Sequence, residues 1–252
     1  MFISMDLDDT LLKTDKSISD YSLNVLKRLK ELGHIIIINT ARNLERTDKY
    51  INAIQADFTI CNAGSLIVDK NKNIIYSDPI SKEVTNEIVT KLLKETNVIS
   101  IQTLDILYNT NKDYLSTHLK EKYRDSDYYL DAYKIMPYKL NKDVALEIVK
   151  MYDVNYTSYF GGNWSRFSKN PNDKLHGLKV VVDYCGADMK ETISFGDDYG
   201  DLPMLEGSFI GVAMQNSIAD VLKNAKHVCE SCDDDGVAKF LNEYFKLGVE
   251  NL

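Results

Sequence analysis

The chain has 252 residues, of which 44% are hydrophobic and 27% charged, a profile typical of a soluble globular protein with one large or two smaller domains. Its net charge of −8, without a long run of Lys and Arg, disfavours a nucleic-acid partner. It has no run of about 18 apolar residues that could span a membrane, and its apolar start turns acidic too soon for a signal peptide. We therefore expect a cytoplasmic protein with neither nucleic acid nor membrane as a partner.

Within the first twelve residues, a short apolar run is followed by clustered carboxylates. This run starts at the N-terminus and has the length of a buried strand, and Asp6, Asp8 and Asp9 follow it, next to Thr10. Open α/β sheets bind ligands outside the carboxyl ends of their strands. If the extended geometry persists beyond Asp6, then Asp6 and Asp8 lie on one side, where their repulsion requires a cation or a shared proton. A solvated acidic turn at a helix entry is the alternative, and this stretch alone leaves both open.

The next elements predict a parallel α/β sheet. Apolar residues at helical spacing run from a capping Ser17 or Ser19 to Gly33. Four isoleucines at 35–38 then indicate a strand that is buried on both faces. The resulting β-α-β unit has parallel strands, so the acids after the first strand and Thr40 after the second can meet at one edge. Further along we expect a helix that Ala41 and Arg42 open and that reaches Ile54, a strand at 58–61, and a hairpin of 66–69 with 74–76.

The composition changes after Pro79. Ten of the sixteen tyrosines lie between Tyr108 and Tyr159, and no glycine occurs between Gly64 and Gly161. Tyrosine suits half-buried strand positions, so packing is favoured over a pocket lining. We interpret 80–171 as an α+β domain inserted into a discontinuous core of 1–79 and 172–252. Its expected helices are 82–95, 112–123 and 141–152, and its expected strands are 98–108, 156–160 and 164–168.

The α/β pattern resumes after the insertion. A helix is expected from Lys174 to Cys185, and a strand at 192–195 runs into Asp197 and Asp201, the second strand that ends in carboxylates. Pro203 suits the first turn of the helix that follows. The remaining expected elements are a strand at 209–214, a helix at 217–222, a strand at 227–229 and a closing helix at 235–245.

The four cysteines do not indicate a metal or redox site. Cys229 and Cys232 form a lone C-x-x-C, whereas a structural zinc site needs four ligands. We expect free, mostly buried thiols, as in a reducing compartment.

Polar groups thus follow several strands that can share one edge. Carboxylates without a Cys/His set indicate a hard cation, and Mg²⁺ prefers oxygen ligands together with a substrate phosphate. A hydroxyl, a lysine and a helix N-terminus can hold an anion at the same edge. The combination predicts phosphoryl transfer, in which the protein positions and neutralises the transferred group and an Asp can be the covalent nucleophile. The residues concerned are Asp6, Asp8, Thr40, Lys174, Asp197 and Asp201.

Four stretches carry a recognisable set of motifs. Residues 2–12 read as an apolar strand followed by D-x-D-x-T-L, 38–42 as a strand that ends in Thr before Ala-Arg, 174–178 as a lysine motif, and 195–205 as G-D-x-x-x-D-x-x-M-L. Together with 211–216 and 235–238, they resemble the haloacid dehalogenase-like hydrolase superfamily, specifically its Cof-type sugar-phosphate phosphatases. The resemblance covers both ends of the chain, and the insertion matches by position only. It implies a Rossmann-like parallel sheet with helices on both faces and an inserted cap domain that selects the substrate.

The resemblance also implies catalytic roles. Asp6 would be the nucleophile that forms an aspartyl-phosphate, and Asp8 would protonate the leaving alcohol and then activate water. Mg²⁺ would be held by Asp6, the backbone carbonyl of Asp8, and Asp197, with Asp201 as an indirect ligand. The metal should keep the pKa of Asp6 low, whereas Asp8 must be able to hold a proton. The implied partner is a small phosphomonoester, and the residues implied to bind its phosphate are Leu7 through its N–H, Thr40, Ala41 and Lys174.

Three positions depart from the family pattern. Ala41 and Gln215 replace glycines, and Gly200 replaces the usual Asn, which removes a polar contact near the phosphate or metal. Alternatives on the same scaffold are a phosphomutase, a phosphonate hydrolase and a catalytically weak phosphate-binding protein. A signalling receiver domain combines similar groups, but this chain is longer by a whole domain, and its second and third strands end without an Asp. No motif ranks the basic residues of the insertion (Lys134, Lys139, Arg166 and Lys169) as substrate ligands, and a homo-oligomer is compatible with the sequence.

Overall fold

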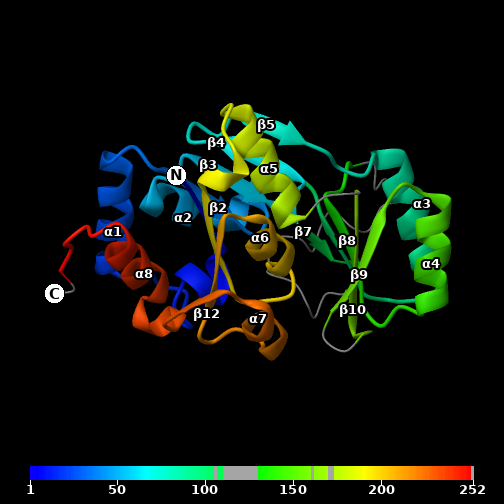
Figure 1. The fold of residues 1–252 in the computed structure, drawn as a ribbon. Helices are drawn as coiled ribbons and strands as arrows, with labels where there is room; N and C mark the ends of the chain where they lie inside the picture. Colours follow the sequence, from blue (N-terminus) through cyan, green and yellow to red (C-terminus); the bar gives the residue numbers. More distant parts are fainter. Residues whose placement is uncertain (105–106, 110–129, 160–161, 170–172, 251–252) are drawn as a thin grey trace. The chain divides into compact units, whose positions relative to one another are not determined.

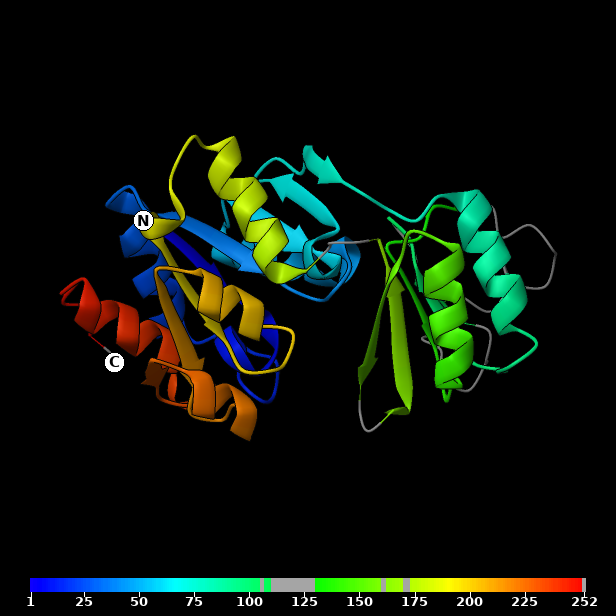
Figure 2. The ribbon, with the colours of Figure 1, turned by 45° about the vertical axis from the view of Figure 1, so that its right-hand side comes forward.

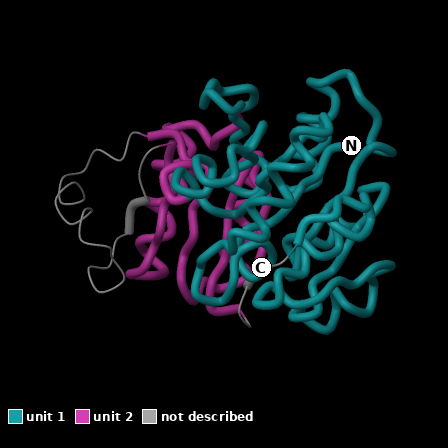
Figure 3. Tube along the Cα trace, turned by 90° about the vertical axis from the view of Figure 1, so that its left-hand side faces the viewer, with its two compact units in different colours: residues 1–42, 47–76, 173–252 teal, residues 43–46, 77–172 magenta. Residues whose placement is uncertain are grey.

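The computed structural model describes residues 1–104, 107–109, 130–159, 162–169 and 173–250. Two compact units make up the chain (Figures 1 and 3). The first consists of Met1–Arg42, Thr47–Tyr76 and Asp173–Leu252, and the second of Asn43–Arg46 and Ser77–Asn172. The segment expected as an insertion, 80–171, falls within the second unit. Its role as a cap domain stays a prediction.

The first unit is built on an eight-stranded sheet in the order β13-β12-β11-β1-β2-β3-β4-β5. The pairs from β13 to β3 are parallel, and β4 is antiparallel to β3. β1 therefore lies inside the sheet, between β11 and β2. The strands are β1 (Phe2–Met5), β2 (Ile35–Asn39), β3 (Phe58–Cys61), β4 (Leu66–Asp69), β5 (Ile74–Ser77), β11 (Thr192–Gly196), β12 (Ile210–Met214) and β13 (His227–Cys229).

Helices cover both faces of this sheet (Figures 1 and 2). Leu178 and Val181 of α5 pack with Ile37 and Met204 on one face, and Phe240 of α8 meets Phe195 on the other. The isoleucine run at 35–38 is largely buried because its alternate side chains enter these two cores. The helices are α1 (Asp20–Glu31), α2 (Leu44–Ile54), α5 (Lys174–Tyr184), α6 (Leu202–Gly207), α7 (Ala219–Asn224) and α8 (Gly236–Tyr244). The predicted fold class is confirmed.

The second unit has a five-stranded sheet in the order β7-β6-β8-β10-β9. Its paired strands are antiparallel. Ile101, Ile135 and Phe167 pack against helices α3 and α4 in one apolar core, so one face of the sheet is covered (Figure 2). The elements are α3 (Lys82–Leu92), β6 (Ile99–Gln102), β7 (Leu107–Asn109), β8 (Lys134–Pro137), α4 (Lys142–Met151), β9 (Asn155–Tyr159) and β10 (Trp164–Ser168).

Two expected elements differ from the structure, and a third element was not expected. Helix α2 begins at Leu44, not at Ala41, because the Asn43 side chain accepts the N–H of Arg46 at the helix start. The single strand expected at 98–108 is two antiparallel strands, β6 and β7. Strand β8 was not predicted, because Lys-Ile-Met-Pro shows no apolar alternation and ends in proline. The helix expected at 112–123 lies outside the described residues.

Within the described ranges, no helix is both long and apolar enough to cross a bilayer.

Candidate active site

The carboxyl end of β1 places the first site residue. The strand ends at Met5, and Leu7–Leu11 form a helical turn in which Asp9 adopts a left-handed conformation (φ 58°). The extended geometry therefore does not persist beyond Asp6, and Asp6 and Asp8 have different partners. The Asp6 N–H donates to the carbonyl of Phe195 in β11, 3.1 Å away, which fixes Asp6 at the junction of two parallel strands.

A buried lysine joins Asp6 to the other acidic strand end. Lys174, the first residue of α5, places its Nζ 2.8 Å from Asp6 Oδ1 and 2.6 Å from Asp201 Oδ1. Asp201 follows β11, and its second carboxylate oxygen accepts the N–H groups of Asp197 and Asp198, each at 3.1 Å. Groups far apart in the sequence thus meet at the carboxyl edge of the sheet, where ligands of α/β folds bind.

The same edge holds three carboxylates that could share a cation. Asp6, Asp197 and Asp201 each offer an oxygen, and these oxygens lie within 4.8 Å of one another. Lys174 is a single ammonium beside them, so the fully ionised cluster keeps an excess of two negative charges. The donors are all oxygen atoms, which suits Mg²⁺. Both oxygens of Asp201 already have protein partners, and its role as an indirect ligand stays a prediction.

Burial, together with the neighbouring charges, shifts the pKa values of the cluster. Burial raises the pKa of Asp6 above its ordinary value and outweighs the attraction of Lys174. Burial also raises the pKa of Asp197, to about 7, although Asp197 Oδ1 accepts a hydrogen bond from Thr10 Oγ1 at 2.7 Å. For Lys174, burial would lower the pKa, but Asp201 and Asp6 outweigh it and raise the value. The chain's own groups thus favour protonated carboxyls, and a bound cation would favour the ionised forms.

Asp8 lies in a different electrostatic setting. Arg42 holds its carboxylate in a two-pronged pair, with Nε–Oδ2 at 2.7 Å and an Nη–Oδ1 contact at 2.6 Å. Lys16 Nζ lies 3.2 Å from the same Oδ1. Burial would raise the pKa of Asp8, but the hydrogen bonds and positive charges of Arg42 and Lys16 together outweigh it and hold that pKa below its usual range. Asp8 is therefore an ionised carboxylate at neutral pH in this conformation.

The predicted phosphate ligands surround the same strand ends. Leu7 and Thr40 are buried and follow β1 and β2, which are neighbours in the sheet. Thr40 Oγ1 accepts the N–H of Arg42, 3.2 Å away. Ala41 is exposed. In this structure the Lys174 ammonium forms ion pairs with Asp6 and Asp201, so its part in phosphate binding stays a prediction.

Sequence reasoning missed two contributors to this site. The sequence analysis assigned no function to Arg42, which lies in the motif at 38–42. An Arg just after a strand end is nevertheless well placed to reach an acid on the neighbouring strand. Thr10 stood beside the acids, but its hydrogen bond to Asp197 joins residues 187 positions apart, which no local pattern reveals.

Gly200 stands where the family pattern has Asn, and its N–H donates to Asp198 Oδ1 at 2.5 Å.

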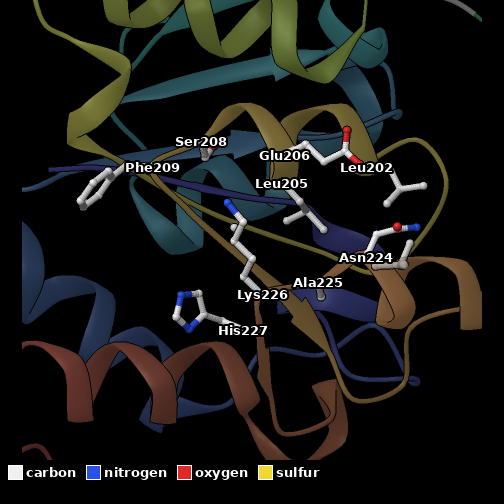
Figure 4. Close-up of a pocket in the computed structure, with 11 residues that line it drawn as sticks. Leu202, Leu205, Glu206, Ser208, Phe209, Asn224, Ala225, Lys226 and His227 are labelled. Carbon is white, nitrogen blue, oxygen red and sulfur yellow. The ribbon is translucent and has the colours of Figure 1, made fainter.

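A separate cavity lies at the opposite end of the sheet. Figure 4 shows its lining from α6, α7 and the starts of β12 and β13, including Leu205, Phe209, Asn224 and Lys226. Its volume of about 110 Å³ falls short of the roughly 300 Å³ at which small-molecule sites begin. It therefore does not compete with the carboxylate cluster as the active site.

The cysteines are free thiols, as expected. Cys61, Cys229 and Cys232 are buried and Cys185 is exposed. Burial raises the pKa of Cys229 to about 12, so this thiol stays protonated at neutral pH and is a poor nucleophile or metal ligand.

Comparisons with known proteins place the chain among phosphatases and related hydrolases. The family model described as haloacid dehalogenase-like hydrolase matches residues 3–241. The chain is 28% identical to a 5-amino-6-(5-phospho-D-ribitylamino)uracil phosphatase of Bacillus subtilis (strain 168), covering 97% of each protein. It is 26% identical to a putative phosphatase of Buchnera aphidicola subsp. Baizongia pistaciae, covering 97% of this chain and 98% of that protein.

Solved structures share the fold. A haloacid dehalogenase-like hydrolase from Bacteroides thetaiotaomicron superposes with a TM-score of 0.82 at 21% identity, covering 97% of this chain and 99% of that one. A sugar phosphatase of subclass IIB of the superfamily superposes with a TM-score of 0.76 at 18% identity, covering 98% and 99%. The family model spans nearly the whole chain. The chain therefore belongs to the haloacid dehalogenase-like hydrolases.

Proposed function

We propose that the protein is a Mg²⁺-dependent phosphatase that hydrolyses small phosphorylated metabolites, such as sugar phosphates, through an aspartyl-phosphate on Asp6. The observation that carries the proposal is the group of three carboxylates and one buried lysine at the carboxyl edge of the sheet. Membership of a hydrolase family and the phosphatase names of relatives support it. The second unit would choose among substrates, as proposed for a cap domain.

The reaction would proceed in two displacements. A carboxylate oxygen of Asp6 attacks phosphorus, the bond to the alcohol oxygen breaks, and Asp8 gives that oxygen a proton. Asp8 then takes a proton from water, which attacks the phosphorus and releases phosphate from Asp6. Mg²⁺, held by Asp6, the Asp8 carbonyl and Asp197, would supply charge neutralisation for the transferred group.

Asp8 must change partners during such a cycle. Its pairs with Arg42 and Lys16 keep it ionised, which suits a base for the second displacement. The first displacement needs a protonated Asp8, so the carboxyl has to part from Arg42 as substrate binds. Thr40 and the N–H of Leu7 would hold the phosphate oxygens, and Lys174 would keep Asp6 oriented toward phosphorus.

Release of p-nitrophenol from p-nitrophenyl phosphate tests the proposal. We expect turnover with Mg²⁺, loss of turnover with EDTA, and its return when Mg²⁺ is restored. Asp6→Asn should lower the rate at least about 10³-fold, because it removes the nucleophile. Asp183→Asn, the same change at an exposed position of α5, serves as the matched control. An Asp6→Asn protein as active as this control would show that Asp6 is not the nucleophile.

A further inference from the structure

A polar side chain occupies an apolar position in the sheet of the first unit. Phe2 in β1 and Ile37 in β2 belong to the apolar core that includes residues of α5 and α6. Side chains two positions apart in a strand point to the same face, so Ser4 and Asn39 continue this face toward the carboxyl edge. Both side chains are fully buried. Asn39 therefore stands where the isoleucines before it predict another apolar residue.

The Asn39 amide links β2 to its neighbouring elements. Its Nδ2 donates to the backbone carbonyl of Lys174 at 2.9 Å, and it lies 3.4 Å from Ser4 Oγ and 3.2 Å from Met204 Sδ. Because the Lys174 carbonyl can only accept, the amide nitrogen and not the amide oxygen faces it. The last residue of β2 is thus hydrogen-bonded to the first residue of α5.

The amide carries a cost that packing does not explain. Asn39 Oδ1 is buried, and within the described ranges no group donates to it. Such an atom costs free energy, whereas an apolar side chain would fill the same position without that cost. Residues that break the local pattern in this way are expected where function requires them. The benefit of Asn39 therefore lies in the contacts of its Nδ2.

The hydrogen bond to Lys174 is the strongest of these contacts. Its 2.9 Å is the usual length of an N–H···O bond, whereas the thioether of Met204 is a weak acceptor and the approach to Ser4 is long. The Lys174 backbone carries the ammonium that lies 2.8 Å from Asp6 Oδ1 and 2.6 Å from Asp201 Oδ1. A shift of this backbone would move the ammonium away from both acids.

Other contacts at the start of α5 act within the helix. The side chain of Asp173 accepts the N–H of His176 at 2.7 Å, which orders the first turn but does not tie it to a strand. Asn39 adds a directional bond between that turn and the sheet. Because Thr40 follows directly, one strand end holds both the Lys174 backbone and a residue expected to bind phosphate.

We propose that Asn39 is a positioning residue, whose amide fixes the backbone of Lys174 and thereby holds its ammonium between the nucleophile Asp6 and Asp201. This inference rests on the proposed function and adds to it a residue to which the motifs assign no role. Asn39 acts through Lys174 and not on the substrate itself.

A double-mutant cycle tests the inference, with kcat/KM for p-nitrophenyl phosphate in the presence of Mg²⁺ as the readout. Asn39→Val removes the amide and suits a buried strand. It should lower kcat/KM about tenfold when Lys174 is present, the net effect of one hydrogen bond. In Lys174→Met no ammonium is left to position, so the same substitution should change kcat/KM by less than about twofold. Equal losses in both backgrounds, or no loss when Lys174 is present, would overturn the inference.

Two further variants make the cycle interpretable. Asn52→Val makes the same change at an exposed position of α2, and we expect it to leave kcat/KM at the wild-type value. Thermal unfolding by circular dichroism confirms that each variant is folded. If Asn39→Val does not fold, Asn39→Ser provides the test, because its side chain is one atom too short to reach the Lys174 carbonyl.

Urea unfolding without Mg²⁺ gives a second cycle that needs no turnover. A displaced ammonium stabilises Asp6 and Asp201 less. Lys174→Met should therefore lower the urea midpoint by more in the wild-type protein than in Asn39→Val. An equal shift in both would show that Asn39 does not position the ammonium, also where Lys174→Met is too slow for kinetics.

The two proposals can fail separately. A wild-type protein that does not hydrolyse p-nitrophenyl phosphate with Mg²⁺ would contradict the phosphatase proposal, and the urea cycle would still decide the role of Asn39. A wild-type protein that does so, with Asn39→Val equally active, would contradict the positioning role alone.

Discussion

Lys174 holds two carboxylates of the site together, with its ammonium buried between Asp6 and Asp201. Removing one partner of a buried ionic group leaves the others unpaired and costs about 3–5 kcal/mol. We therefore expect Lys174→Met, measured by urea unfolding at pH 7 without Mg²⁺, to lose stability on this scale. Mg²⁺ should restore part of it by replacing the missing positive charge.

The matched control for this prediction is Lys179→Met, which makes the same substitution at an exposed position of the same helix. It should change the free energy of unfolding by no more than about 0.5 kcal/mol. If both variants unfold at the same urea concentration, Lys174 does not hold the acids together.

At the scale of single residues, the sequence identified site residues by their position directly after a predicted strand. Asp6, Thr40 and Asp197 each follow a predicted strand, so their meeting at one edge follows from parallel strands alone. The partners of Asp8 could not be foreseen in this way. Arg42 reaches Asp8 across 34 positions, and whether the acid turns toward Arg42 or toward Asp6 depends on the turn at Leu7–Leu11.

At the scale of elements, helix α5 approaches β3 and the turn after it because two glycines lack side chains. A Cβ at Gly177 would lie 2.5 Å from Ile60 Cγ2, and one at Gly64 would lie 2.0 Å from the Asp173 carbonyl oxygen. Gly64 also has a left-handed φ of 101°, which favours glycine. This close approach sets the position of the first turn of α5, which carries Lys174.

Gly177→Ala tests this dependence. The added methyl should push α5 from the sheet, cost about 1–3 kcal/mol of stability, and lower kcat for p-nitrophenyl phosphate because Lys174 moves with its helix. Urea unfolding and steady-state kinetics measure the two effects. Lys179→Ala, on the exposed side of α5, is the control for a substitution to alanine in this helix. Unchanged stability and kcat in Gly177→Ala would show that the packing of α5 tolerates the methyl and does not set the site.

Element by element, the first unit was easier to predict than the second. The run at 35–38 is apolar throughout, as buried parallel strands are, and the strands of this unit alternate with amphipathic helices. In the second unit, β8 carries the buried polar residue Lys134 among its apolar residues. A short strand that buries a charged side chain lacks the apolar signal by which strands are found, which accounts for the missed element.

At the scale of the whole molecule, the acidic cluster links folding stability to pH and to metal. The pKa of Asp197 is raised to about 7 from an ordinary value of 3.8, and that of Asp6 is raised as well. At a pH between 3.8 and about 7, the native protein keeps a proton on Asp197 that the unfolded chain has lost. The contribution of the cluster to stability therefore falls as pH rises through this window. Asp8 has a lowered pKa, so its stabilising contribution is lost only as pH falls below that window.

His34 affects stability in the opposite sense, because burial lowers its pKa in the native protein. Its contribution to stability therefore rises with pH until the pH reaches the pKa that His34 has in the unfolded chain. The informative quantity is therefore the difference in Tm between wild type and Asp197→Asn, since His34 contributes equally to both. With EDTA, we expect wild type to lose stability relative to Asp197→Asn as pH rises from 5 to 8. Mg²⁺ should reverse this loss in wild type more than in the variant, because the cation stabilises the ionised carboxylates. A Tm difference that is independent of pH, with or without Mg²⁺, would mean that Asp197 is not held protonated by burial and does not contribute to a cation site.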